Sequence, residues 1–241
     1  MTYQLKYKPF GEQSVLIEWP QIISKEILKD VLSFKAKLEA EKRIHDVNHA
    51  YNSLLVSFND FTNGLESKIN ELEAIYNTAH IVNKYAFKRW RIPVCYDTHF
   101  GIDLHELALT NNLSVDEVIR RHSTISYTVY FIGFLPGFLY LGGLDKTLYT
   151  PRKASPRLKI EKGAVAIGGG QTGIYPSESP GGWNIIGNSP INFFDIKAQT
   201  PCFANAGDEI QFYQVSKEIH SNIKTLVEAG VYQIESEVIN D

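Results

Sequence analysis

The chain of 241 residues can form one large domain or two smaller ones, and its apolar content of 44% is that of an ordinary globular protein. A net charge of −3 argues against a nucleic-acid partner, and two cysteines, Cys95 and Cys202, are too few for a disulfide framework. The first residues lack the apolar core of a signal peptide, and no apolar run approaches membrane-spanning length. We therefore expect a cytoplasmic protein without a membrane partner.

Residues 1–84 have the pattern of a small α+β domain. Alternating or amphipathic apolar positions predict two strands within 3–19, a helix over 24–43 capped by Ser24, a strand at 53–58 and a helix over 65–79. This order indicates helices that cover one face of a sheet. The polar stretch from Asn77 to Lys84 is the expected domain boundary.

Residues 85–241 have the pattern of a mainly-β domain. Pro93 places the strand around Trp90 near a sheet edge, Ser114 with Glu117 forms a capping box, and Gly230 closes the last helix. The predicted elements are strands at 90–95, 127–131, 191–196, 209–215 and 231–235, and helices at 104–108, 114–122 and 217–229. Many short strands with glycine-rich turns favour a β-barrel or a sandwich.

Glycine, proline and aromatic residues gather between Tyr127 and Pro190, and we interpret this stretch as the functional surface. Within it, Gly168–Gly173 invites comparison with a phosphate-binding loop, but the lysine and hydroxyl residue of that motif are absent. A tight β-turn is the favoured interpretation, and backbone amides that hold an anion are the alternative.

Several polar side chains of the stretch are candidates for ligand contacts. Arg152 and Arg157 each follow a proline, so a stiff backbone would present a guanidinium to a carboxylate or phosphate; exposed surface arginines are the alternative. His122 could act as an acid or a base, or as a cation at a helix end. Gln171, Thr172 and Tyr175 could supply neutral hydrogen bonds, and Trp183 could form a pocket wall. For Trp183 alone, a buried tryptophan of the core is the favoured interpretation.

The residues alone therefore predict a shaped polar ligand site on a β domain. No triad order, HExxH, CxxC or paired acidic motif occurs, so we expect no metal and no tightly bound cofactor.

Four segments carry a resemblance to a known family: Ile92–Tyr96, Gly133–Leu141, Gly169–Pro176 and Ser179–Trp183. Together they resemble the allophanate hydrolase subunit 1 family, also called the carboxyltransferase C/D domain family. Among its members the chain is most similar to the B subunit of 5-oxoprolinase and to the Kip inhibitor of sporulation kinase A. The resemblance covers the second domain nearly end to end, and the first in length and element order.

The resemblance implies a cyclophilin-like β-barrel after a small α+β domain. It also implies two partners: the C subunit of 5-oxoprolinase, of the allophanate hydrolase subunit 2 type, with which the ligand site is shared, and the A subunit. In 5-oxoprolinase such a complex cleaves 5-oxo-L-proline to L-glutamate with ATP as co-substrate. The alternative that the family implies is an inhibitor that binds a sensor histidine kinase and blocks its autophosphorylation.

By resemblance, the arginines hold the substrate carboxylate or the transferring phosphoryl group, while Gln171 and Tyr175 orient the lactam. The catalytic candidates are His122, Arg152 and Arg157. The substrate-binding candidates are Gly137, Phe138, Tyr140, Gly170, Gln171, Thr172, Tyr175, Gly182 and Trp183.

The sequence departs from the family pattern beside this stretch. Family members commonly have an arginine where Asn188 stands, proline and a small residue where Glu161 and Lys162 stand, and serine at Ala164. Loss of an arginine weakens the expected anion pocket and leaves room for a role in binding only.

Overall fold

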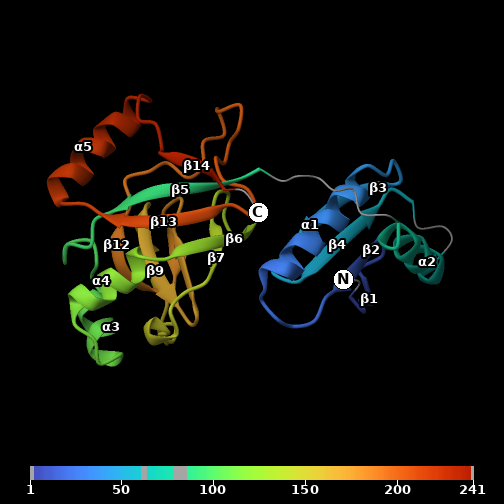
Figure 1. Cartoon of the computed structure of the whole chain (residues 1–241), viewed down its shortest axis with the longest axis horizontal. Helices are drawn as coiled ribbons and strands as arrows, with labels where there is room; N and C mark the ends of the chain where they lie inside the picture. The colour runs from blue at the N-terminus through green and yellow to red at the C-terminus, as the bar shows by residue number, and fades with distance from the viewer. Residues whose placement is uncertain (1–2, 61–63, 79–85, 240–241) are drawn as a thin grey trace. The chain divides into compact units, whose positions relative to one another are not determined.

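The computed structural model describes residues 3–60, 64–78 and 86–239. The chain divides into two compact units, Met1–Tyr85 and Ala86–Asp241 (Figure 1). The boundary expected at residue 84 lies outside the described residues.

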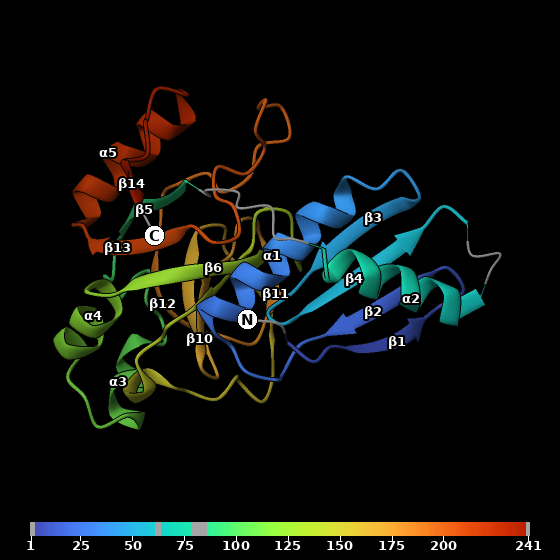
Figure 2. The same cartoon turned by 45° about the vertical axis from the view of Figure 1, so that its right-hand side comes forward.

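The first unit is a four-stranded antiparallel sheet with the order β1-β2-β4-β3. Val15 and Ile17 alternate with more exposed neighbours in β2, so one face of the sheet is apolar. Both helices bury residues in the same core on that face (Figure 2). The elements are β1 (Lys6–Phe10), β2 (Ser14–Glu18), α1 (Lys25–Glu39), β3 (Ile44–His49), β4 (Ser53–Phe58) and α2 (Gly64–Tyr76). The strand β3 was not predicted from the sequence.

A buried carboxylate connects the parts of the first unit. Asp30 of α1 accepts hydrogen bonds through Oδ2 from Trp19 Nε1 and from the hydroxyl of Tyr76, each at 2.7 Å. Trp19 follows β2 and Tyr76 ends α2, so a single oxygen joins the sheet to both helices. Ser24 caps α1 as predicted, because its side chain accepts from Ile27 N.

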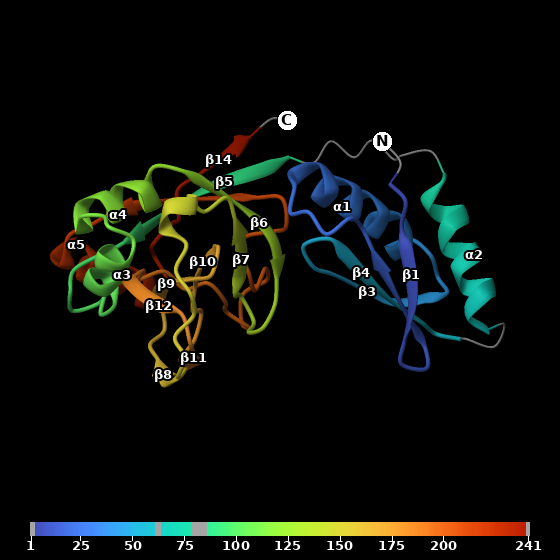
Figure 3. The same ribbon diagram turned by 90° about the horizontal axis from the view of Figure 1, so that it is seen from below.

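The second unit is built on an eight-stranded sheet with the order β12-β9-β10-β7-β6-β13-β5-β14. Neighbours are antiparallel except β5 and β13, which run parallel. A separate pair, β8 and β11, lies beside it (Figure 3). The elements are β5 (Phe87–Val94), α3 (Leu104–Thr110), α4 (Val115–Ser123), β6 (Ser126–Ile132), β7 (Leu139–Gly142), η1 (Lys146–Leu148), β8 (Arg157–Ile160), β9 (Ala164–Gly168), β10 (Gln171–Ile174), β11 (Ser179–Gly181), β12 (Asn184–Asn188), β13 (Glu209–Gln214), α5 (Lys217–Glu228) and β14 (Ser236–Ile239).

The expected cyclophilin-like barrel is not confirmed. Only one residue pair, Cys95 with Asn188, joins the end of β5 to the end of β12, through two backbone hydrogen bonds of 2.9 and 3.0 Å. Since β5 stops at Val94 and β12 stops at Asn188, no longer ladder forms between these strands in the part of the chain that the structure describes. The second unit is therefore a mixed α/β structure with an incompletely closed sheet.

Two predictions for single strands were wrong, whereas the one for β5 was confirmed. The strand β5 lies next to the edge strand β14, which pairs only with Phe87–Trp90, so Pro93 lies near a sheet edge and interrupts no pairing with β14. Residues 191–196 form no strand, and the last strand starts at Ser236, beyond the range 231–235.

The carboxylate of Asp30 generates a prediction about stability. Asp30→Ala leaves the indole N–H of Trp19 and the hydroxyl of Tyr76 without an acceptor, and a buried donor left unpaired costs about 1 to 3 kcal/mol. We expect the free energy of unfolding to fall by about 2 to 4 kcal/mol in urea titrations followed by circular dichroism. Glu12→Ala, at an exposed turn residue, is the control. Equal stability of the two variants would contradict this account.

Candidate functional site

The turn between β6 and β7 positions the first aromatic residues of the candidate site. Gly137 has φ +81°, and a Cβ there would lie 2.7 Å from Phe194 Cβ, so only glycine fits. Gly137 was predicted to bind substrate, and the structure places it against the chain at Phe193 and Phe194. Its conformation directs the following residue, Phe138, into the core.

Four aromatic residues form what we call the aromatic cluster: Phe138, Tyr140, Tyr175 and Trp183. The ring centroid of Phe138 lies 5.0 Å from Tyr140, 5.7 Å from Tyr175 and 5.8 Å from Trp183. Trp183 lies flat against Gly168, where a Cβ would come within 2.5 Å of the indole. Three of the four rings are buried and Tyr140 is half-buried, so the cluster is mainly a small hydrophobic core.

Both predicted arginines lie near this cluster. The Arg152 guanidinium carbon is 5.7 Å from the centre of the Trp183 ring, and the side chain is exposed without an ion-pair partner among the described residues. Burial raises the pKa of Tyr175, while the backbone N–H of Trp183 and the charges of Arg152 and Arg157 act in the opposite direction. The structure thus brings Tyr175, Trp183 and both guanidinium groups into one region.

Arg157 differs from Arg152 because it is engaged with a buried carboxylate. Its two terminal nitrogens donate to Asp103 at 2.9 and 2.6 Å, and Asp103 is only 2% exposed. Asp103 also accepts from the backbone N–H of Ile185 at 2.7 Å. Arg157 therefore balances a buried charge, and its fork is not free to hold a ligand carboxylate as the sequence analysis expected.

His122 and Thr172 lie on the opposite face of β10, in the main core. The Thr172 hydroxyl donates to Ala166 O, so it accepts from His122 Nε2 at 2.8 Å, and Nδ1 accepts from the Tyr96 hydroxyl at 2.7 Å. The imidazole is 0% exposed and burial lowers the pKa of His122 to about 3. A neutral ring with both nitrogens bonded does not support the predicted catalytic role, and Thr172 is equally closed to a ligand.

The remaining predicted residues lie in or next to turns. Gly168 pairs with Gln171 across a tight hairpin turn in which Gly169 has φ +64°, as the favoured interpretation predicted. A Cβ at Gly170 would meet the Tyr149 ring at 2.9 Å, and Gly182 precedes Trp183 in ordinary contact distance of Lys153. Gly170 and Gln171 thus belong to the β9–β10 tip.

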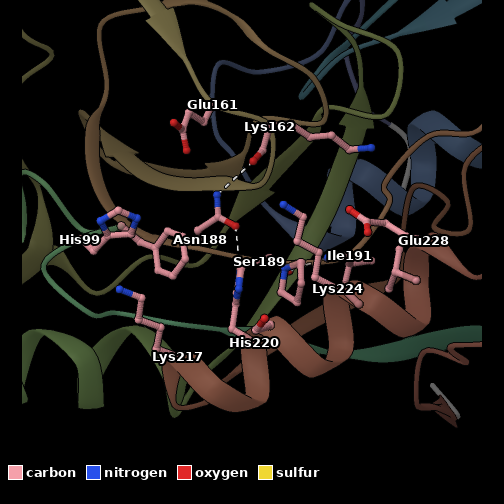
Figure 4. A pocket seen from close by; sticks show the side chains of 14 residues that line it. His99, Glu161, Lys162, Asn188, Ser189, Ile191, Lys217, His220, Lys224 and Glu228 are labelled. Carbon is pink, nitrogen blue, oxygen red and sulfur yellow. Dashed lines mark hydrogen bonds between the residues drawn. The ribbon is translucent and has the colours of Figure 1, made fainter.

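A pocket of about 460 Å³ lies between α5 and the end of β12, where no site was predicted. We call it the α5 pocket (Figure 4). Its lining includes His99, Phe100, Glu161, Lys162, Asn188, Ser189, Lys217, His220, Lys224 and Glu228. A neighbouring pocket of about 280 Å³ shares His99, Phe100, Glu161 and Asn188 and extends to Arg157, so the two adjoin.

The spacing of three polar residues in the sequence is a signal for this pocket. Lys217, His220 and Lys224 are spaced by three and four residues, which places them on one face of a helix. Only the fold shows that Asn188, at a position where family members commonly carry arginine, faces this helix: His220 Nε2 is 2.9 Å from Asn188 Oδ1.

The described residues contain neither a metal cluster nor a membrane-spanning helix. Within them, no group of three His, Cys, Asp or Glu side chains lies close enough to hold a metal ion. No helix of the described ranges is both long and apolar enough to span a bilayer.

Comparison with known proteins places the chain in a family. Residues 5–204 match the family described as carboxyltransferase domain, subdomain C and D, which confirms the resemblance seen in the sequence. The chain is 37% identical over 204 residues to the 5-oxoprolinase B subunit of Haemophilus influenzae, across 85% of this chain and 95% of that protein. It is 34% identical over 234 residues to the 5-oxoprolinase B subunit of Bacillus subtilis, across 92% and 98%.

A solved structure supports the fold. The urea carboxylase of Kluyveromyces lactis superposes with a TM-score of 0.80 over 98% of this chain and 24% of that chain, at 19% identity. Similarity at this level of identity establishes the fold and not the activity. From the family match over most of the chain and the two relatives above 30% identity, we conclude that this chain belongs to the carboxyltransferase domain, subdomain C and D, family.

Proposed function

We propose that the chain is the B subunit of an ATP-dependent 5-oxoprolinase. Together with the C and A subunits of that enzyme, it would cleave 5-oxo-L-proline to L-glutamate, with ATP as co-substrate. The observation that carries the proposal is the similarity to proteins named as 5-oxoprolinase B subunits over nearly the whole of both chains. We also propose activity in the assembled complex only, since both ring nitrogens of His122, the predicted acid or base, are bonded within the core.

The chemistry explains why ATP is needed. The carbonyl carbon of a cyclic amide is a poor electrophile because the nitrogen donates electron density to it. Transfer of a phosphoryl group to the amide oxygen makes that carbon an easier target for water, after which the C–N bond opens and phosphate leaves. The substrate and the phosphoryl group are both anionic, so cations on this chain have a clear use.

The three predicted catalytic residues have three different roles in this proposal. Arg152, exposed above Trp183, is able to contact an anion directly. Arg157 acts as a positioning residue because it fixes Asp103, which in turn holds the N–H of Ile185 in β12. His122 stabilises the core.

The kinase-inhibitor alternative rested on the absence of the family arginine at Asn188. In this chain Asn188 bonds to Lys162 O and to His220, and the surrounding pocket carries three lysines. Asn188 is therefore held in place by hydrogen bonds, and its surroundings are cationic even without an arginine at this position. This observation favours the enzyme component over a role in binding only.

The first prediction from this proposal is a dependence on the chain itself. Reconstitution of the chain with the A and C subunits of its enzyme should give ATP-dependent release of glutamate from 5-oxo-L-proline, measured by chromatography. Leaving out this chain should reduce the rate at least about tenfold, a change of about 1.4 kcal/mol in activation free energy. An unchanged rate without the chain would end the proposal.

A second prediction separates the two arginines. Arg157→Ala leaves the carboxylate of Asp103 without its bidentate partner and should lower the free energy of unfolding by about 1 to 3 kcal/mol. Arg152→Ala removes an exposed cation–π contact and should cost less than about 1 kcal/mol of stability.

Arg152→Ala, the variant with the smaller loss of stability, should lose activity in the assembled enzyme. Its kcat/KM should be at least about tenfold lower while the fold is intact. Urea unfolding and steady-state kinetics on the same preparations provide both readouts. Full activity of Arg152→Ala would rule out its contact with an anion.

A third prediction concerns pH and His122. The unfolded imidazole binds a proton near its ordinary pKa of about 6.5, and the folded one only near 3. Stability is therefore complete above pH 6.5 and falls below it, by up to about 1.4 kcal/mol per pH unit. His122→Asn lacks this titration, so its stability deficit relative to the parent should shrink by about 2 kcal/mol between pH 7 and pH 5. Urea unfolding at both pH values tests this, and a constant deficit would contradict a neutral buried imidazole.

A further inference from the structure

The starting point is the orientation of the Asn188 side chain. Asn188 is 8% exposed, and its Nδ2 donates to Lys162 O at 3.0 Å. Because the nitrogen end of the amide is committed to a carbonyl, the oxygen end faces His220. His220 Nε2 lies 2.9 Å from that oxygen and so carries the proton of the imidazole.

The other nitrogen of His220 is consequently a hydrogen-bond acceptor. No described residue donates to Nδ1, although His220 is only 5% exposed. Among the described residues no fully buried side-chain nitrogen or oxygen lacks a partner, so Nδ1 reaches the solvent of the α5 pocket, which His220 lines. Burial, and then the charge of Lys224, lower the pKa of His220, which keeps the ring neutral and Nδ1 able to accept.

Positive charge surrounds this acceptor. Lys217 and Lys224 leave α5 on either side of His220, and Lys162 lines the other side of the pocket from the loop before β9 (Figure 4). None of the three lysines forms an ion pair with a described carboxylate; Lys162 donates to the neutral amide of Asn192. The pocket also contains Glu161 and Glu228, so the lysines leave an excess of one positive charge. Lys217 stands in the first turn of α5, where the helix dipole adds to the positive potential.

The α5 pocket therefore offers two different interactions at once: cations for an anionic group, and a neutral acceptor for an N–H donor. Its volume of about 460 Å³ suits a small molecule. A substrate that is both a carboxylate and a cyclic amide has these two complementary groups. A phosphate group would also satisfy the lysines, so the KM for ATP is measured beside that for the cyclic amide to distinguish the two occupants.

We propose that the α5 pocket binds the cyclic amide substrate, with its carboxylate between Lys217 and Lys224 and its amide N–H donated to His220 Nδ1. This inference rests on the proposed function and assigns the substrate a place within it. Asn188 is a positioning residue, since it fixes which nitrogen of His220 faces the substrate. The lining of the α5 pocket then determines recognition of the substrate, and Arg152 beside the aromatic cluster is left for the phosphoryl group.

The test uses the assembled enzyme and two variants of the pocket. Lys224→Gln removes an exposed cation, and His220→Phe removes the acceptor while keeping a ring against Phe100. Each should raise the KM for 5-oxo-L-proline at least about fivefold and leave the KM for ATP within about twofold. Lys146→Gln, an exposed lysine of η1 that does not line the pocket, is the matched control and should change neither constant.

The outcomes are separable. If activity requires the chain but both pocket variants keep the KM for 5-oxo-L-proline, the inference is wrong and the proposed function stands. A raised KM for ATP alone would assign the pocket to a phosphate group and would also overturn the inference. If activity does not require the chain, the proposed function and the inference fall together. Circular dichroism shows whether His220→Phe is folded. If it is not, the KM values of Lys224→Gln, a substitution at the surface, test the inference by themselves.

Discussion

The arrangement of the second unit depends on Asn188. Its backbone makes the one bridge that joins the end of β12 to the end of β5 at Cys95, and its side chain connects Lys162 O to His220 on α5. Three segments far apart in the sequence are thus held by a single neutral residue. An amide can do this because it donates from one end and accepts at the other, whereas an arginine only donates. An asparagine at this position therefore sets the connections of the pocket as well as its charge.

Charged groups near the candidate site fall into two classes by their partners. Asp103 is buried and needs compensation, which Arg157 and the N–H of Ile185 provide. Arg152, Lys217 and Lys224 are exposed and have no carboxylate partner among the described residues, so they keep their charge available for a ligand. The distinction between a structural and a ligand-binding cation lies in this pairing and not in the residue type.

The two buried histidines illustrate the same rule. His122 has a hydroxyl at each ring nitrogen and no exposure, so its protonation has no consequence for a ligand. His220 has one nitrogen held by Asn188 and the other open to a pocket. Burial lowers the pKa of both imidazoles, and the number of partners alone decides which one can contact a small molecule.

Local patterns in the sequence were enough to predict the family, the helices α1 to α5 and the strands β1, β2, β4, β5, β6 and β13; Ser24 and Ser114, for example, cap helices. The strands β7 to β12 and the packing of Phe138 against Trp183 were not predicted, because they depend on contacts between segments. The α5 pocket was not predicted, and a catalytic role was predicted for His122 that its buried, doubly bonded ring does not support. Solvent exposure and hydrogen-bond partners depend on contacts between segments that are distant in the sequence. Asn188 and His220 are 32 residues apart, and only the tertiary structure decided that the two meet, because that contact depends on how α5 folds back over the end of β12.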